Sequence, residues 1–576
     1  GNPNVPGYPE VDERTVDLTD VEPNILVTKQ VCNESLNGFG TGCSAFADSI
    51  NDGDTNDSYI YRITLENDNT HPVTRSPAFN LVSTDTLDAS DLMLIVDFAT
   101  DGLDNDGDTQ VDEADEAALF ASIPDNIVGN GTPAVITVDE SFNALLQRID
   151  PGPANRITFY YRVDPDITIA PLQTLTNTVS MSYDSLDSDF GNQNPPQLDN
   201  SATAPDDAGR ARIYTTIPQT ADVQMIPLLA QPMLVIEKSN TPLTLAPNDV
   251  SIGEEIRYQM IAELPVANLR QFRIRNELPQ GLSCSELQEV NLSTGIYAAA
   301  GFVPGGPPVS TTCTRTAGAA NDVVEWNFGD QAVTASLPGN RFQFPINFVA
   351  RVENTSFTNE NLTITNAGTA VNPATCSAAA GSSAAVCYVN DGGSDVALDF
   401  ASVDVVVREP VIELTKSFVD NASLDVTNSD AGDVLTVRVT AVNNGTAAAY
   451  NLQVLDDLAG SDLTYINDSM GGPHAPDDDG VTADSKAPVF SWNIANPDYE
   501  ILTGAANTKT LTFQVRVDTT AQPLEILDNT IEAKWDSLPD RNTALNTIPG
   551  TIGPDGTPLG LRNGAVPNAA DTINDY

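Results

Sequence analysis

The sequence predicts an all-β chain built from tandem β-sandwich domains in an extended end-to-end array. Alternation of apolar and polar residues runs through most of the 576 residues, and helical periodicity is confined to a short stretch near residues 112–121. Clusters of Gly, Pro, Asn and Asp interrupt the alternation at short intervals, as turns between strands do. The same series of strand-like segments occurs three times. Because each series is much longer than a propeller blade, each is expected to be a whole domain.

The opening strand defines the repeat. Each copy begins with a proline and ends with a lysine: Pro23 to Lys29, Pro232 to Lys238, and Pro410 to Lys416. The later segments match in the same order: SYIYRITLEN, EEIRYQMIAEL and DVLTVRVTAVNN; AFNLVSTDTL, QFRIRNELPQGL and NLQVLDDLAGSDL; ITFYYRVD, FPINFVARVE and LTFQVRVD; LTNTVSMSYDSL, LTITNAGTA and LDNTIEAKWDSL. Several short alternating strands in each copy are typical of an immunoglobulin-like sandwich.

The linkers between copies give the expected domains: an N-terminal arm or linker, 1–22; a first sandwich with an acidic insertion, 23–230; a second sandwich, 231–408; and a third sandwich with a C-terminal arm, 409–576. The segment 191–207 and the end of the chain are rich in Pro, Gly and Asn and are expected to be extended arms. The first residues, DERTVDLTDVEP, look like the linker DFASVDVVVREP between the second and third copies. The chain therefore begins as though another unit preceded it. It opens with neither Met nor a signal peptide, which we interpret as a mature product or a fragment.

The net charge of -54 argues against one class of partner. So acidic a surface repels phosphate backbones and anionic lipid, so we expect no nucleic-acid binding. No run of about twenty apolar residues is present, so we expect no membrane insertion. Divalent cations are the natural counterions of this surface. Charge alone would also fit the cytoplasm of a halophile.

The cysteines indicate the compartment. The six fall into local pairs, Cys32 with Cys43, Cys284 with Cys313, and Cys376 with Cys387, and none has a CxxC or zinc-like spacing. This pattern predicts three disulfides, two of them in the second sandwich, and an extracellular or cell-surface protein. Six buried free thiols are the alternative.

The repeated strands resemble the conserved-repeat, immunoglobulin-like domains of large bacterial and archaeal surface proteins, and their relatives the isopeptide-forming fimbrial domains. The resemblance covers most of the chain and rests on the opening V-x-K strand, the V-x-D-x-L strand, and the N-T pair in the last strand. It implies extracellular spacing and adhesion rather than catalysis.

The segment DGLDNDGDTQVDEADE is a candidate calcium loop. It is similar to the aspartate-rich calcium loops of thrombospondin type 3 and related bacterial repeats. The candidate ligands fall at positions 1, 3, 5, 9 and 12 of an EF-hand-like loop: Asp104, Asp106, Asp108, Asp112 and Asp115. The loop departs from the pattern at Thr109, where glycine is usual, and at Asp115, where Glu is usual. A solvated acidic turn is the alternative, but five neighbouring carboxylates repel one another unless a cation lies among them.

Strand alternation also brings polar residues to the apolar side of each sandwich, because residues two apart share a face. Lys29, Lys238 and Lys416 lie on the apolar face of the opening strand. The V-x-D strand supplies Asp85 or Asp456, and the last strand supplies Asn177, Asn366 or Asn529, on the same side. A buried ammonium is costly unless it is paired or neutral, so these groups are expected to meet.

In the isopeptide-forming fimbrial domains such a constellation links lysine to asparagine while the acid moves protons. The resemblance implies the autocatalytic sets Lys29, Asp85, Asn177 and Lys416, Asp456, Asn529. The second copy has Asn276 in place of the acid, which puts its bond in doubt. The alternative is a lysine at the strand end with its head in solvent and an asparagine that caps a turn.

Catalysis is not expected. The two histidines, His71 and His474, lie beside prolines in loop-like sequence, without the partners that a hydrolytic triad or a zinc site needs. Trp326 and Trp492 occupy equivalent repeat positions, which favours core residues over a sugar-binding platform. A secreted glycoside hydrolase, which needs only two carboxylates, is the least favoured alternative.

The sequence therefore predicts an extracellular structural protein, a segment or subunit of a calcium-stabilised surface fibre or filament. Its expected partner is a further copy, end to end, or a covalent continuation in a longer chain. The alternative is an adhesin whose loops bind a carbohydrate or a host protein.

Overall fold

The computed structural model describes most of the chain. The described residues are 21–38, 43–70, 75–87, 92–95, 135–140, 144–166, 168–187, 212–238, 247–288, 290, 292, 297, 303–304, 310–315, 321–334, 341–355, 357–378, 380–390, 393–420, 424–492, 496, 500–538 and 562. The chain divides into two compact units, Gly1–Ile226 and Pro227–Tyr576.

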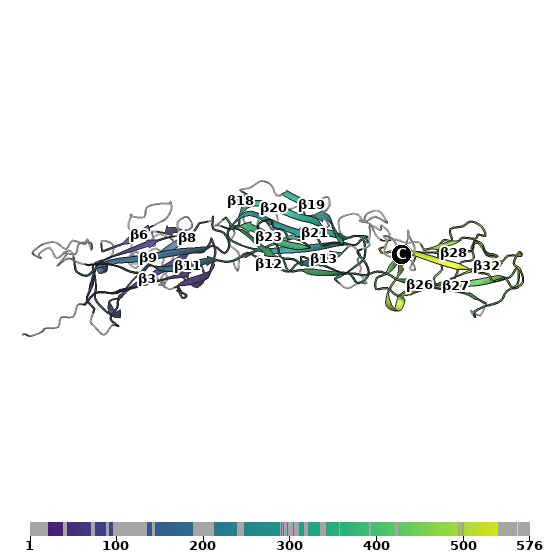
Figure 1. Cartoon of the computed structure of the whole chain (residues 1–576), viewed down its shortest axis with the longest axis horizontal. Helices are drawn as coiled ribbons and strands as arrows, with labels where there is room; N and C mark the ends of the chain where they lie inside the picture. Colours follow the sequence, from purple (N-terminus) through teal and green to yellow (C-terminus); the bar gives the residue numbers. More distant parts are fainter. Residues whose placement is uncertain are drawn as a thin grey trace, which may run out of the picture. The chain divides into compact units, whose positions relative to one another are not determined.

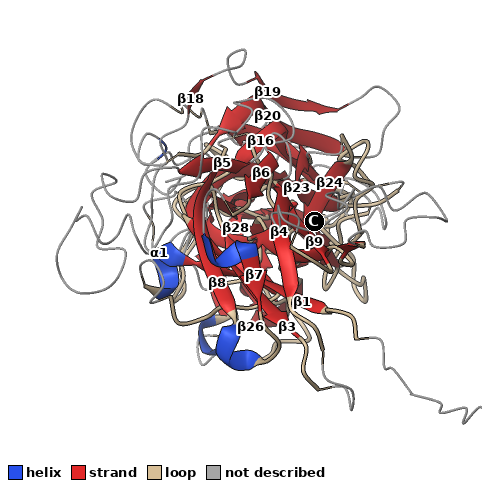
Figure 2. Ribbon diagram, turned by 90° about the vertical axis from the view of Figure 1, so that its left-hand side faces the viewer, coloured by secondary structure: helices blue, strands red, loops and turns tan. Residues whose placement is uncertain are grey.

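β-strands make up nearly all of the regular structure (Figure 2). The described helical segments are short: α1 (Glu34–Asn37) and the 3₁₀ turns η2 (Ala144–Gln147), η3 (Pro153–Asn155) and η4 (Gly504–Ala506). The all-β class predicted from the alternation is confirmed. Among the described residues, no helix is both long enough and apolar enough to cross a lipid bilayer.

The first unit is a sandwich of two sheets. One has the strand order β1-β3-β8-β5, and the other has the order β2-β11-β9-β4-β6, with β10 beside β9 and β7 beside β4. The strands are β1 (Ile25–Asn33), β2 (Ser49–Gly53), β3 (Tyr59–Asn67), β4 (Ala78–Thr86), β5 (Leu92–Ile95), β6 (Val135–Val138), β7 (Arg148–Ile149), β8 (Ile157–Pro165), β9 (Thr174–Asp184), β10 (Ile213–Thr215) and β11 (Gln219–Met225). Alternate residues of both sheets, such as Val31 and Ile63 in one and Val179 and Val223 in the other, form a single apolar core.

The second unit contains two separate apolar cores. The first core lies among sheets with the orders β12-β15-β21-β17, β14-β25-β22 and β18-β20-β16-β23-β24. In addition, β13 pairs with β15 and β19 with β20. The strands are β12 (Leu229–Ala230), β13 (Leu234–Lys238), β14 (Asp249–Val250), β15 (Glu255–Pro265), β16 (Asn268–Glu277), β17 (Leu282–Leu287), β18 (Val303–Pro304), β19 (Ser310–Arg315), β20 (Asp322–Ala332), β21 (Arg341–Val352), β22 (Thr363–Asn366), β23 (Ser383–Val389), β24 (Asp395–Asp399) and β25 (Val403–Val407).

The other core of this unit lies between the sheets β26-β27-β32-β29 and β30-β28-β31, with β33 paired to β28 (Figure 1). The strands are β26 (Ile412–Val419), β27 (Val434–Asn443), β28 (Ala449–Asp457), β29 (Leu463–Tyr465), β30 (Val489–Ser491), β31 (Glu500–Ile501), β32 (Thr508–Val517) and β33 (Thr530–Asp536). The three cores follow the three copies of the sequence repeat and are called here the first, second and third sandwich. The boundaries 23–230, 231–408 and 409–576 as independent folding units stay a prediction.

Candidate functional site

Lys29 lies inside the first sandwich, on β1. Its neighbours Val27 and Val31 belong to the apolar core, so strand alternation directs the lysine inward as well. The ammonium pairs with the Asp85 carboxylate of β4, and both side chains are almost completely buried. The register places Asp85 opposite Val179 on β9, so Asn177, two residues earlier, faces the same side of the sheet.

Two tyrosines complete this site. The Lys29 Nζ lies 5.3 Å from the ring centroid of Tyr61 and 5.7 Å from that of Tyr161, and the two rings stack. Asn177 donates from Nδ2 to the Tyr161 hydroxyl at 2.5 Å, and among the described residues its Oδ1 accepts no hydrogen bond. The asparagine carbonyl is therefore held in the core beside a buried acid and a buried amine.

Burial sets the protonation of this pair. Desolvation lowers the pKa of the Lys29 ammonium to about 8, although the Asp85 charge opposes the shift. Desolvation also raises the pKa of the Asp85 carboxyl, against the opposing effects of Lys29 and of hydrogen bonds from Tyr161 and Asn177. Both shifts favour the uncharged forms, a free amine beside a protonated acid.

The third sandwich has the same arrangement in a more open form. Lys416 Nζ lies 2.6 Å from Asp456 Oδ1, and Asn529 Nδ2 lies 3.4 Å from Asp456 Oδ2. Burial lowers the pKa of Lys416 and raises that of Asp456, as in the first sandwich. However, Asn529 is only half-buried, whereas Asn177 is fully buried.

The second sandwich lacks such a set. Its lysine, Lys238, is buried and donates to the Asp249 backbone carbonyl. Asn276, at the position of the acid, donates to Asn366 Oδ1 at 3.0 Å. Two amides thus bond to each other where the other sandwiches place an acid beside the asparagine, so the position that would move a proton holds no carboxyl.

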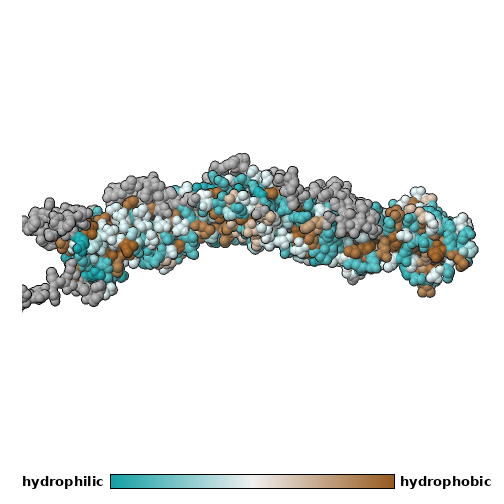
Figure 3. Space-filling model, in the orientation of Figure 1, coloured by the Kyte–Doolittle hydropathy of each residue, from teal (hydrophilic) through white to brown (hydrophobic). Residues whose placement is uncertain are grey.

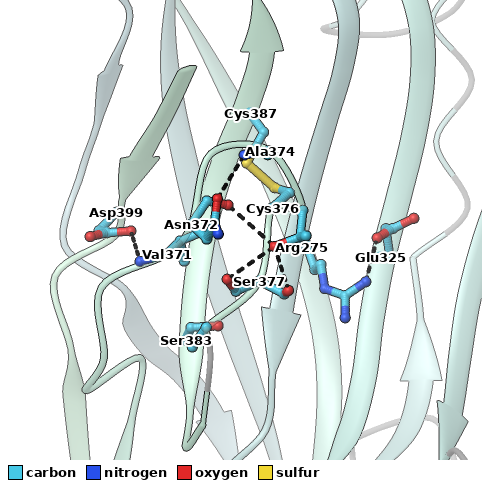
Figure 4. The surroundings of a disulfide bond; sticks show 12 residues. Arg275, Glu325, Val371, Asn372, Ala374, Cys376, Ser377, Ser383, Cys387 and Asp399 are labelled. Atoms are coloured by element: carbon cyan, nitrogen blue, oxygen red, sulfur yellow. Dashed lines mark hydrogen bonds and ion pairs between the residues drawn. A yellow bond between two sulfur atoms is a disulfide. The ribbon is translucent and has the colours of Figure 1, made fainter. Parts of the chain in front are cut away.

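All six cysteines are paired as disulfides: Cys32–Cys43, Cys284–Cys313 and Cys376–Cys387. Figure 4 shows the last of these, which ties a turn to β23. In that turn the Asn372 amide donates to the Ser377 carbonyl at 2.9 Å, and Asn372 Oδ1 accepts from the Ala374 amide at 3.0 Å. The disulfide therefore fixes a loop that already has its own hydrogen bonds.

The residues considered for catalysis have structural partners. His474 Nδ1 accepts from the Thr510 amide, and the His474 carbonyl accepts from the Trp492 indole. Trp326 and Trp492 are buried core residues, as the repeat positions predicted. In the described part of the chain, no group of three or more His, Cys, Asp or Glu side chains is placed to hold a metal ion. The predicted calcium ligands Asp104, Asp106, Asp108, Asp112 and Asp115 lie outside the described residues, as does His71.

Three residues of interest escaped sequence analysis. Tyr61 and Tyr161 contact Lys29 from strands β3 and β8, and only the fold brings these strands beside β1. Arg562 lies in the predicted C-terminal arm but is buried and bonded. A local signal for it is the DSL sequence at Ser185 and again at Ser537, because each serine bonds to an arginine farther along the chain.

No protein-family model and no curated protein matches the chain. Among solved structures it is similar to the full-length major pilin SpaD from Corynebacterium diphtheriae, with 10% identity, TM-score 0.20, and coverage of 79% of this chain and 82% of that chain. It is also similar to BcpA, the major pilin subunit of Bacillus cereus, with 8% identity, TM-score 0.21, and coverage of 76% and 80%. The Streptococcus agalactiae AgI/II polypeptide BspA C-terminal domain has 12% identity, TM-score 0.19, and coverage of 66% and 99%. At these values the likenesses carry no argument about function.

Proposed function

We propose that this chain is an extracellular structural protein, a segment or subunit of a surface fibre that holds something away from a cell. The observation that carries the proposal is that every sandwich contains a tie between distant parts of its own fold. The first and second contain disulfides, and the first and third contain a buried lysine paired with an acid on another strand. Ties of this kind resist unfolding, which is what a spacer under tension requires.

The disulfides also support the location. Such bonds form and persist in oxidising surroundings, and they are rare in most cytosolic proteins. The net charge of -54 fits a saline exterior, where screening extends only several ångströms and limits self-repulsion.

The Lys–Asp–Asn sets support a covalent role. We infer that the neutral amine of Lys29 attacks Cγ of Asn177, so that a new C–N bond forms and the bond from Cγ to the asparagine nitrogen breaks. Asp85 accepts the proton that the amine loses and donates one to the departing nitrogen, which leaves as ammonia. No oxidant is needed, and the acid ends in its starting state. Lys416, Asp456 and Asn529 carry out the same step in the third sandwich.

Calcium at Asp104 to Asp115 remains part of the proposal on sequence grounds alone. The loop DNDGDTQVDEAD contains no lysine or arginine, so a cation is the available way to balance its carboxylates.

Antibody labelling of intact cells that produce the protein tests the proposal. We expect gold particles on the cell surface, at a distance from the envelope and along thin fibres. Label confined to the cell interior would contradict a surface role. Specific binding to a glycan array by the purified chain, without fibres on the cells, would instead support the adhesin alternative.

A further inference from the structure

The third sandwich lacks, among the described residues, a strand that the other two contain. In the first sandwich β11 pairs antiparallel with β9 and parallel with β2. In the second, β25 occupies the same place, antiparallel to β22 and parallel to β14. In the third, β33 is the counterpart of β9, and within the described part of the chain it pairs only with β28.

An open groove marks this place. Residues 426–431, the counterpart of β2 and β14, form one wall, and residues 521–527, which precede β33, form the other. Phe418, Leu435 and Val517 also line it, and its volume is about 920 Å³. Figure 3 shows brown, apolar atoms on the visible surface of this sandwich as well.

Core positions beside the groove are correspondingly exposed. Leu527 is half-buried, whereas its counterparts Leu175 and Ile364 are 0% and 3% exposed. Leu435 is also half-buried, whereas its counterpart Ile256 is fully buried. Since both walls contribute apolar side chains and neither wall belongs to a described strand, the groove fits one added β-strand.

The sequence at the start of the chain matches the missing strand. Val16-Asp17-Leu18 precedes Pro23 by the same spacing at which Val403-Asp404-Val405, the start of β25, precedes Pro410. We propose that residues 15–21 of a second copy of this chain occupy the groove as this strand, so that copies join head to tail. The inference rests on the proposed function and names the partner and its binding site.

The register of β25 fixes the expected contacts. Val405 lies opposite Ile364 and Val406 opposite Thr363, which places Leu18 opposite Leu527 and Thr19 opposite Ile526. Asp20 then takes the place of Val407, whose parallel neighbour in the second sandwich is Val250. The counterpart of Val250 in the third sandwich is Ser429, so the groove is polar where the incoming strand is polar.

The chain's own C-terminal segment fits less well. Ala570-Asp571-Thr572-Ile573 resembles Ala221-Asp222-Val223-Gln224 of β11. In that alignment the polar Thr572 takes the position of the fully buried Val223, and the apolar Ile573 takes the exposed position of Gln224. The N-terminal segment instead aligns Leu18 with Val405, a fully buried position.

An arginine at the border between the second and third sandwiches shows how one sandwich joins the next. Arg562 binds the Glu409 carboxylate at 2.6 Å and the Thr355 and Thr358 carbonyls at 2.8 and 3.0 Å. The Ser537 hydroxyl accepts from the Arg562 amide. Arg562 is thereby buried between the two sandwiches.

The first sandwich carries the same group at its own opening strand. The Ser185 hydroxyl accepts from the Arg212 amide, and Arg212 pairs with Glu22 at 2.8 Å, just before Pro23. The Arg212 side chain is 62% exposed, which leaves it room for a further contact. On a second copy, the counterpart of the Thr355 loop is residues 518–521, which adjoin the groove.

Disulfide trapping between two full-length variants tests the proposal. Thr19→Cys and Ile526→Cys, each in a separate preparation, are mixed under mild oxidation, because facing residues of an antiparallel pair are close enough for a disulfide. We expect a covalent heterodimer on a non-reducing gel, with a cross-link between positions 19 and 526 in peptide mapping. Thr530→Cys is the matched control, an exposed position four residues farther along, and should give little heterodimer.

Two further arms separate specific docking from chance contact. A synthetic peptide of residues 13–24 should block the heterodimer, and the same peptide with Leu18→Asp should not. Arg212→Ala should weaken association by about tenfold, as loss of a hydrogen-bonded charge would, whereas Arg148→Ala, another exposed arginine, should not.

Absence of the heterodimer, or equal yields at residues 526 and 530, would overturn strand exchange. A heterodimer that forms only after residues 563–576 are removed would assign the groove to the chain's own end and overturn it as well. A monomeric chain that antibodies still place on surface fibres would refute this inference and leave the proposed function standing.

Discussion

One residue type at one repeat position has different surroundings in the three sandwiches. Lys29 and Lys416 each contact a buried acid, and Lys238 contacts a backbone carbonyl. Burial lowers the pKa of all three lysines, so the shift alone does not distinguish them. The acid does, because a carboxyl that touches both amine and amide can move protons during the attack.

The covalent hypothesis predicts a mass change. The wild-type chain should be lighter than its sequence by one ammonia for each bond, with Lys29–Asn177 and Lys416–Asn529 as cross-linked peptides. Asn177→Ala should restore one ammonia mass and destabilise the first sandwich by about 5 kcal/mol, the loop-entropy value for a cross-link spanning more than about a hundred residues. Intact-mass and peptide spectrometry, together with thermal melting, measure both effects.

Asn366→Ala is the matched control, because Asn366 occupies the same repeat position but bonds to an amide rather than to an acid. It should leave the mass deficit unchanged. A wild-type chain with the full sequence mass would show that the buried pairs are ion pairs only.

At the scale of strands and loops, the sequence predicted those features that depend on alternation and local pairing. The inward lysines follow from the two-residue period of β1 and β26, and the cysteines pair locally in a chain otherwise rich in turns. The tyrosines around Lys29 could not be predicted, because they depend on which strands become neighbours. The parallel pairing of β2 with β11 and of β14 with β25 is equally non-local, since it joins segments far apart in the sequence.

The acidic insertion between β5 and β6 leads to a calcium prediction. Chelation by EDTA should lower the melting temperature of the chain and speed proteolysis near residues 104–115, because five carboxylates then repel one another. Asp106→Asn with Asp108→Asn should reproduce the effect in calcium. Asp48→Asn with Asp150→Asn, two solvent-accessible acids of the same unit, serves as a control for general loss of charge.

The readouts are differential scanning calorimetry and timed digestion followed by peptide mapping. Adding calcium back should reverse the effect of EDTA in the wild-type chain and have little effect in the loop double variant. Identical melting curves with calcium and with EDTA would contradict a structural ion in this loop.

At the scale of the whole molecule, the sandwiches use different ties, so they should respond differently to reductant. The second sandwich contains two disulfides, the first contains one, and residues 409–576 contain no cysteine. A disulfide that closes a loop of roughly ten to thirty residues contributes about 3 kcal/mol, largely through the entropy of the unfolded chain. Reduction should therefore destabilise the second sandwich most and the first less, while the third provides an internal control.

Hydrogen exchange measured by mass spectrometry, with and without reductant, resolves the three responses within one sample. We expect the largest loss of protection in β16, β20 and β23, which form the sheet that the two disulfides of the second sandwich tie, and a smaller loss in β1 and β3. Strands β27 and β32 should exchange at the same rate in both conditions. Uniform loss of protection across all three cores would mean that they unfold as one cooperative body, and the tandem organisation inferred from the repeat would then describe the sequence but not the folding units.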